Sequence, residues 1–233
     1  MKDCAQCVVR NNAICAALLP DELEALSRLG RKQKVSRGQT VVWEGDDCII
    51  IANVISGILK LSMSISDGRE QIVGVVFPSD FIGRPFGQTS PYSVTALSDA
   101  ELCIFSRSSF DAFARKHPEL QHKLLQRTLT ELDRAREWML LLGKKAAHER
   151  IATLLLEMSN RLGENGCSAN HHALDSFELP LDRQQMGDLL GLTIETVSRQ
   201  LSRLKADGVI ALPDRRMVAI QDRGRLQDIA AAA

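Results

Sequence analysis

The sequence predicts an α+β protein in which a strand-rich domain comes first, a long helix follows and a winged helix-turn-helix ends the chain. Three patterns lead to this fold class. Between 35 and 105, apolar or alternating runs are separated by turn signals about every ten residues. Between 118 and 142, mostly apolar residues recur at heptad spacing. Between 181 and 216, two short amphipathic segments around a glycine precede an apolar hairpin.

The composition is that of an ordinary soluble globular protein, because 45% of the 233 residues are hydrophobic and 25% are charged. No apolar run approaches the length of a transmembrane helix, and the first residues lack the hydrophobic core of a signal peptide. We therefore expect a cytoplasmic protein that does not span a membrane. Nothing in the sequence assembles a nucleophile, a base and an oxyanion site, so we do not expect an enzyme.

Three cysteines lie within twelve residues near the N-terminus. Two residues separate Cys4 from Cys7, and seven separate Cys7 from Cys15. Disulfides are disfavoured in the cytosol, so this spacing favours a metal or redox role. Thiolates are soft ligands that select zinc, copper(I) or an iron–sulfur cluster. Zinc or a cubane cluster normally needs a fourth ligand, and this short polar arm offers none.

The strand-rich domain follows a short amphipathic helix that Pro20 opens in its first turn. The clearest strand runs from Leu59 to Ile65, where apolar and polar residues alternate as in a half-buried strand. Short strands with this turn punctuation suggest a sandwich, a jelly roll or a barrel. We expect a short helix from Ser106 to Lys116 to end the domain.

The long helix is expected to run from Pro118 to Leu142 and to stop at Gly143. One of its faces carries a heptad seam, which favours a homodimer. The seam consists of Leu125, Thr128, Leu132, Ala135, Met139 and Leu142. The alternative is that this face packs against the chain's own strands. A second apolar stripe is present for that purpose, formed by Leu120, Leu124 and Trp138.

After a further helix from Lys144 to Leu162 and a polar loop, the segment 181–205 indicates two helices around a tight turn. Asp182 with Gln185 predicts a capping box, Gly191 a turn and Thr193 the cap of the second helix. This layout is typical of a helix-turn-helix, whose second helix enters the major groove of DNA. The polar face of that helix presents Glu195, Ser198, Arg199, Ser202 and Arg203.

Side chains of these types can read base edges, since arginine donates to guanine, glutamate accepts from cytosine and serine bonds either way. The alternative is a surface helix with an ion pair between Glu195 and Arg199, which lie four residues apart. A hairpin with Arg215 and Arg216 near its tip follows. The chain as a whole has no net charge. Between 199 and 216, however, it has five basic and two acidic residues, so the positive charge that would attract DNA is confined to this segment.

The segment ETVSR (195–199) followed by a basic hairpin resembles the FNR branch of the CRP/FNR superfamily of bacterial transcription regulators. The resemblance covers nearly the whole chain. It implies a β-roll sensor of the cyclic-nucleotide-binding type, and a homodimer that binds double-stranded DNA and RNA polymerase. The implied target is a TTGAT-N4-ATCAA-like palindrome. The implied base-reading residues are Glu195, Ser198 and Arg199, and the other expected DNA contacts are Thr193, Thr196, Arg203, Arg215 and Arg216.

A lone cysteine in an apolar strand is usually inert packing, and Cys103 lies in such a segment, LCIFS. In the FNR resemblance, however, Cys103 matches the fourth ligand of a 4Fe-4S cluster, beside Cys4, Cys7 and Cys15. The seven-residue spacer is that of a subgroup of the branch. The implied protein is an oxygen-responsive regulator whose cluster ties the arm to the end of the β-roll. Cys48 and Cys167 match nothing, and we expect them to be structural or incidental.

Superfamily members that bind cyclic nucleotides hold the ribose with a Gly-Glu pair and the phosphate with an Arg-Ser pair. This sequence has Gly83-Arg84-Pro85 and Pro91-Tyr92-Ser93-Val94 at the two places. The acid and the cation are both missing, so we expect no cyclic nucleotide. A regulator with a structural zinc, or one gated by another small effector without oxygen sensing, remains the alternative.

These assignments divide the chain into four parts. They are a cysteine-rich cluster arm (1–19), a β-roll sensor domain (20–117), a dimerisation helix (118–143) and a winged helix-turn-helix DNA-binding domain (144–233).

Overall fold

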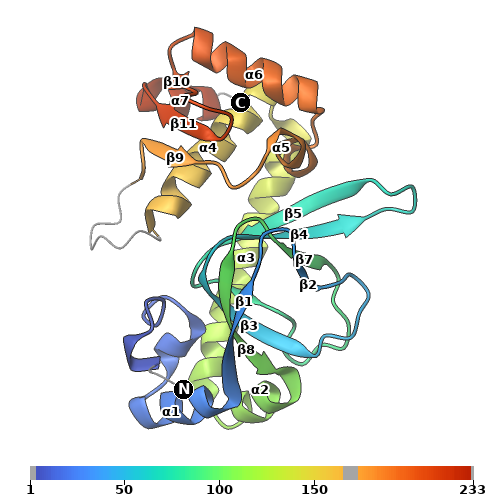
Figure 1. The fold of residues 1–233 in the computed structure, drawn as a ribbon, viewed down its shortest axis with the longest axis vertical. Coiled ribbons are helices and arrows are strands. Elements are labelled where there is room, and N and C mark those ends of the chain that lie inside the picture. The colour runs from blue at the N-terminus through green and yellow to red at the C-terminus, as the bar shows by residue number, and fades with distance from the viewer. Residues whose placement is uncertain (1–3, 165–172, 232–233) are drawn as a thin grey trace. The chain divides into compact units, whose positions relative to one another are not determined.

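The computed structural model describes residues 4–164 and 173–231. The chain forms two compact units, Met1–Asp133 and Arg134–Ala233. Helix α3 (Pro118–Lys144) begins in the first unit and ends in the second (Figure 1). The division into four parts stays a prediction.

The first unit is a β-roll of two four-stranded antiparallel sheets (Figure 1). The sheet orders are β1-β8-β3-β6 and β2-β7-β4-β5. The strands are β1 (Gly30–Val35), β2 (Thr40–Val42), β3 (Ile50–Ser56), β4 (Leu59–Ser64), β5 (Glu70–Val76), β6 (Phe81–Ile82), β7 (Ser93–Ala96) and β8 (Ala100–Ser106). Buried apolar side chains from both sheets form one core, with Leu59 and Leu102 fully buried. The predicted α+β class is confirmed. Of the three strand arrangements that the sequence allowed, a sandwich, a jelly roll or a barrel, the domain forms the roll.

The two faces of strand β3 pack against different parts of the first unit. Ala52 and Val54 belong to the core of the roll, whereas Ile51 and Ile55 belong to apolar clusters with the helices and the N-terminal arm. The helices on this outer side are α1 (Pro20–Leu29), α2 (Arg107–Ala114) and the start of α3. The outer face of β3 is therefore where the arm meets the roll.

Helix α3 does not stop at Gly143, so the predicted end is wrong: the helix continues to Lys144. Gly143 is not among the glycines with positive φ, the conformation that a helix-ending glycine adopts. Carbonyls near the helix end are instead satisfied by Arg150 on the next helix, α4 (Ala147–Glu164). The Arg150 guanidinium donates to the Leu142 carbonyl at 2.7 Å and to the Lys145 carbonyl at 2.8 Å.

Among the described residues, no helix combines the length and the apolar character needed to cross a membrane.

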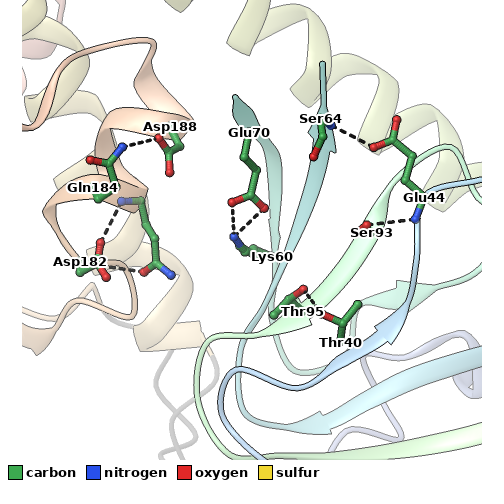
Figure 2. Close-up of polar contacts among 11 residues, drawn as sticks. Thr40, Glu44, Lys60, Ser64, Glu70, Ser93, Thr95, Asp182, Gln184 and Asp188 are labelled. Carbon is green, nitrogen blue, oxygen red and sulfur yellow. Dashed lines mark hydrogen bonds and ion pairs between the residues drawn. The ribbon is translucent and has the colours of Figure 1, made fainter. Parts of the chain in front are cut away.

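The second unit contains the predicted helix-turn-helix, formed by α5 (Arg183–Leu190) and α6 (Ile194–Ala206). The capping box is confirmed: the Gln185 backbone N–H donates to Asp182 Oδ1, and the Asp182 N–H donates to Gln185 Oε1, both at 2.9 Å. Figure 2 labels Asp182 and draws hydrogen bonds at this residue. Gly191 has φ +63°, as the turn requires. The hydroxyl of Thr193 caps α6 by accepting from the Thr196 N–H.

The wing is a three-stranded sheet rather than a hairpin alone. Strands β10 (Ile210–Ala211) and β11 (Met217–Ile220) form the predicted hairpin, and β9 (Ser176–Glu178) pairs with the other side of β11. A final helix, α7 (Arg223–Ala231), buries Leu226 and Ala230. The sequence did not predict β9 or α7, because a three-residue strand and a helix with two buried positions carry too little periodic signal.

Candidate metal centre and DNA-binding face

The four cysteines predicted as ligands line one pocket on the outer face of the roll. Cys4, Cys7 and Cys15 come from the arm, and Cys103 comes from β8. The rest of the wall is contributed by the arm, α1 and strands β1, β3 and β8: Val9, Arg10, Leu23, Leu26, Ser27, Lys32, Asn53, Ile55 and Phe105. The structure therefore brings together the full predicted ligand set from distant parts of the chain.

The arm is seated on the roll by apolar contacts as well as by turns. Cys4–Gln6 and Ile14–Ala17 each form a single 3-10 turn. Between them, Val9 and Ala13 join Ile55 of β3 in a small buried cluster. The interpretation of the arm as simply polar is therefore wrong, since apolar contacts hold it beside the cysteines.

The register of the sheet surrounds Cys103 with one cation and one amide. Cys103 pairs with Lys32 on β1 and with Asn53 on β3. Asn53 is 1% exposed, and its Nδ2 donates to the sulfur of Cys15 at 3.4 Å. Positions on paired strands point to the same face of a sheet, so these groups converge on the pocket.

Burial disfavours the thiolate forms of Cys15 and Cys103 when no cation is present, and the neighbouring cysteines add to this effect. Burial raises the pKa of the Cys15 thiol to about 11, and Cys4 and Cys7 add electrostatic repulsion. Burial also raises the pKa of Cys103 to about 12, and the three arm cysteines contribute in the same direction. A bound metal must therefore displace protons, and its positive charge compensates the repulsion between the sulfurs.

Zinc and a 4Fe-4S cluster place different demands on four thiolate ligands. Within the described ranges, no three Cys, His, Asp or Glu side chains converge closely enough to hold one metal ion. A zinc ion needs four ligands that meet at one point, with sulfurs at about 2.3 Å. A 4Fe-4S cluster is held by four thiolates on four irons, so its ligands stand farther apart. Four soft sulfur donors around an apolar pocket are ligands of the kind that zinc and iron–sulfur clusters both take.

The two remaining cysteines do not belong to this pocket. Cys48 is 2% exposed, and its sulfur accepts a hydrogen bond from the Arg84 backbone N–H at 3.2 Å. This contact gives Cys48 a packing role in the roll. Cys167 lies outside the described residues.

The predicted base-reading side chains are exposed on α6. Glu195, Ser198 and Arg199 are exposed, whereas the opposite face buries Val197, Leu201 and Leu204. The Arg199 guanidinium lies within hydrogen-bond distance of the Thr196 hydroxyl, at 3.4 Å. Hydrogen bonds from its own backbone N–H and from the Thr193 hydroxyl hold the pKa of Glu195 below its usual value. The cap of α6 and its polar face therefore form one network.

The arginines near the wing differ in their surroundings. Arg203 is exposed and lies 3.9 Å from the Asp207 carboxylate. Arg215 is exposed. Arg216 is half-buried, and its guanidinium donates to the Pro180 carbonyl at 3.5 Å. The sequence did not indicate this contact of Arg216 with the backbone of Pro180. Because Arg215 is the more exposed of the two, its guanidinium is more accessible to a DNA phosphate.

The predicted dimer seam on α3 is mostly exposed. Leu125, Leu132 and Met139 are 56%, 44% and 72% exposed, Thr128 and Ala135 are exposed, and Leu142 is half-buried. From the second apolar stripe, Leu120 is fully buried and Leu124 packs against the same cluster, while Trp138 is half-buried. The sequence interpretation missed two exposed members of the apolar face, Leu129 and Leu140. The four-residue spacing from Leu125 to Leu129 could have indicated the first of them.

The positions that would hold a cyclic nucleotide carry no acid or arginine in the predicted roles. Gly83 has φ +103°, and a side chain there would meet the Ile50 carbonyl, so the glycine is needed for the turn. Tyr92 packs against the apolar core of the roll, and burial raises its pKa.

Two domain families match the chain: residues 32–117 match the cyclic nucleotide-binding domain, and residues 149–229 match the Crp-like helix-turn-helix domain. The chain is 46% identical to the transcriptional activator protein FnrL of Cereibacter sphaeroides, over 96% of this chain and 90% of that protein. It is 36% identical to the nitrogen fixation regulation protein FixK of Bradyrhizobium diazoefficiens, over 98% of this chain and 94% of that protein.

A comparison of folds also points to this family. The structure of FixK2 from Bradyrhizobium japonicum is similar with a TM-score of 0.78 at 33% identity, covering 88% of this chain and 98% of that chain. Sequence, domain order and fold agree over most of the length. The chain belongs to the Crp/Fnr family of transcription regulators, with a domain of the cyclic-nucleotide-binding type followed by a Crp-like helix-turn-helix.

Proposed function

We propose that this protein is an oxygen-responsive transcription activator that binds DNA as a homodimer while Cys4, Cys7, Cys15 and Cys103 hold a 4Fe-4S cluster. When bound, the cluster supplies an oxygen-sensitive link between the arm and β8. The exposed seam of α3 pairs with that of a second copy, and the two α6 helices enter successive major grooves. The proposed target is a TTGAT-N4-ATCAA-like palindrome, and RNA polymerase is the expected further partner.

The observation that carries this proposal is that the three arm cysteines and Cys103 line one pocket. Burial, and secondly the neighbouring cysteines, raise the pKa of Cys15 and of Cys103 there, so the pocket opposes their ionisation unless a cation is bound. Packing alone does not require four cysteines around one pocket, because other small apolar side chains could fill the same positions. The relatives named as transcriptional activators support the regulatory part of the proposal.

Two contacts connect the arm to the dimer helix within the first unit. The Arg127 guanidinium on α3 donates to the carbonyl of Asn12, in the spacer between Cys7 and Cys15. Leu120 at the start of α3 shares a buried cluster with Ile14 of the arm. Releasing the arm would remove both contacts from the helix that carries the seam. This is a physical route from the cysteine pocket to the dimer.

The test of the proposed function is the visible spectrum of anaerobically purified protein, with its iron and sulfide content. We expect iron–sulfur absorbance that air bleaches, with four irons and four sulfides for each chain. Zinc in place of iron and sulfide would contradict the proposal and favour the structural-zinc alternative.

Replacing Arg199 with alanine should reduce specific DNA binding by about 1–3 kcal/mol, through the loss of a bidentate guanine contact. Arg215→Ala is the matched control, because this exposed wing arginine should contact phosphate and weaken specific and random DNA alike. Binding isotherms on intact and base-substituted half-sites separate the two effects. Equal losses on both DNAs for Arg199→Ala would contradict its role in base reading.

Cyclic AMP at millimolar concentration should leave the DNA affinity unchanged. The chain matches a domain family named for cyclic nucleotide binding, but Arg84 stands where the ribose acceptor is expected, and the phosphate position has no arginine. Calorimetry of the purified protein with cyclic AMP is the direct measurement. Saturable binding in the micromolar range would overturn this prediction.

A further inference from the structure

Asn53 is a polar residue buried in the middle of a core strand. Its side chain is 1% exposed, and the neighbouring Ala52 and Val54 on β3 are fully buried. Asparagine is uncommon in strands, and burying an amide costs stability unless its hydrogen bonds are made. An apolar residue would fill this position more favourably, so the amide needs an explanation.

The nitrogen and the oxygen of the Asn53 amide differ in their hydrogen bonding. Nδ2 donates to the sulfur of Cys15 at 3.4 Å. The carbonyl oxygen Oδ1 is buried and has no hydrogen-bond partner in the described part of the chain. An orphaned buried acceptor is unfavourable, and such groups are rare in native proteins. A metal-bound Cys15 would account for the orientation, because a thiolate can only accept hydrogen bonds and therefore needs the N–H end.

The position of Asn53 relates it to two of the proposed ligands at once. It is the register partner of Cys103 across β3 and β8, and it donates to Cys15 from the arm. It lines the same pocket as both cysteines. The residue therefore lies where the arm and the sheet meet around the pocket, and not at a distant core position.

We propose that Asn53 is a positioning residue for the cluster, whose amide holds the Cys15 sulfur and stabilises the negative charge on that ligand. This inference rests on the function proposed above. Hydrogen bonds to ligand sulfurs help to set the reduction potential of iron–sulfur clusters, and those that involve a charged group are the stronger ones. A donor at Cys15 favours the electron-rich state of the ligand, so it should slow the attack of oxygen on the centre.

The test uses full-length protein reconstituted anaerobically. Asn53→Leu keeps the branched shape with two methyl groups in place of the amide and so removes the donor, while Asn53→Asp keeps the shape and replaces the donor with an acceptor. For both variants we expect the iron–sulfur absorbance to decay in air roughly tenfold faster than in the wild type, the factor typical of a hydrogen bond to a charged group. The reduction potential should become more negative. Ser62→Ala is the control, since Ser62 is 3% exposed but lies on β4 of the other sheet.

Two further readouts distinguish a positioning role from a merely structural one. Reconstitution in heavy water should shift the iron–sulfur stretching frequencies of the wild type, and this shift should shrink in Asn53→Leu because the N–H···S bond is gone. Cluster-free Asn53→Leu should melt at the wild-type temperature or above it, because the substitution removes the orphaned oxygen. A structural role alone predicts a lower melting temperature and an unchanged decay rate.

The failures of the two proposals are separable. If the wild type assembles the cluster and Asn53→Leu decays at the wild-type rate with an unchanged isotope shift, the inference about Asn53 is wrong and the proposed function stands. If the wild type assembles no cluster, the proposed function is wrong and the role of Asn53 is lost with it.

Discussion

Serine in place of Cys4, Cys7, Cys15 or Cys103 is expected to abolish both the anaerobic iron–sulfur absorbance and the specific binding of DNA. A serine hydroxyl is a much harder ligand than a thiolate, so one substitution leaves an iron without a suitable donor. In the proposed function, metal binding would join the arm to β8 and close a long loop, so its free energy would stabilise the docked arm. We expect near-complete rather than graded losses, measured as iron and sulfide content and as anaerobic gel shifts.

The two other cysteines supply matched controls for this series. Cys48→Ser and Cys167→Ser should keep the full absorbance and the specific DNA complex. Because Cys48 is buried, a melting curve of its variant must accompany the iron measurement. A full cluster in Cys103→Ser, or its loss from a folded Cys48→Ser, would show that the ligand assignment is wrong.

Aspartate at Leu132 or Ala135 is expected to raise the dimer dissociation constant by at least roughly 100-fold. The substitution places an unpaired carboxylate against its symmetry mate in an apolar seam, and burying such a charge costs several kcal/mol. Both positions are exposed in the single chain, so the folded protomer should tolerate the change. Sedimentation should show mainly monomer at concentrations where the wild type is dimeric, with the cluster still present.

The control for the seam is Gln126→Asp, which adds the same charge to an exposed polar position of α3. It should leave the dimer intact, because Gln126 lies on a different face from the seam. Dimers of unchanged stability in both Leu132→Asp and Ala135→Asp would place the dimer contact elsewhere on the chain.

The helix-turn-helix could be predicted in detail because its determinants are local. The reciprocal bonds of Asp182 and Gln185, the positive φ of Gly191 and the Thr193 cap each depend on a few neighbouring residues. The same holds for the start of α1 at Pro20, where the first turn suits a proline. Local chemistry of this kind is visible in the sequence before any tertiary contact is known.

Features that depend on long-range packing could not be predicted from the residues alone. The register of β1, β8 and β3 places Lys32 and Asn53 on either side of Cys103, and no sequence pattern encodes that register. The contact of Arg150, from the next helix, with the Leu142 carbonyl near the end of α3 is likewise a tertiary contact that no local pattern indicates. Arg216 gave no sign of its contact with the Pro180 carbonyl, since its exposure depends on how the wing folds back.

The most direct test of the central claim is the operator affinity of one anaerobic wild-type preparation, measured before and after its cluster is removed by air. Fluorescence anisotropy with a TTGAT-N4-ATCAA duplex and with a random duplex gives both dissociation constants. We expect cluster loss to weaken operator binding at least tenfold and to leave binding to random DNA nearly unchanged. Equal operator affinity with and without the cluster would contradict oxygen sensing through these cysteines, even if all four are ligands.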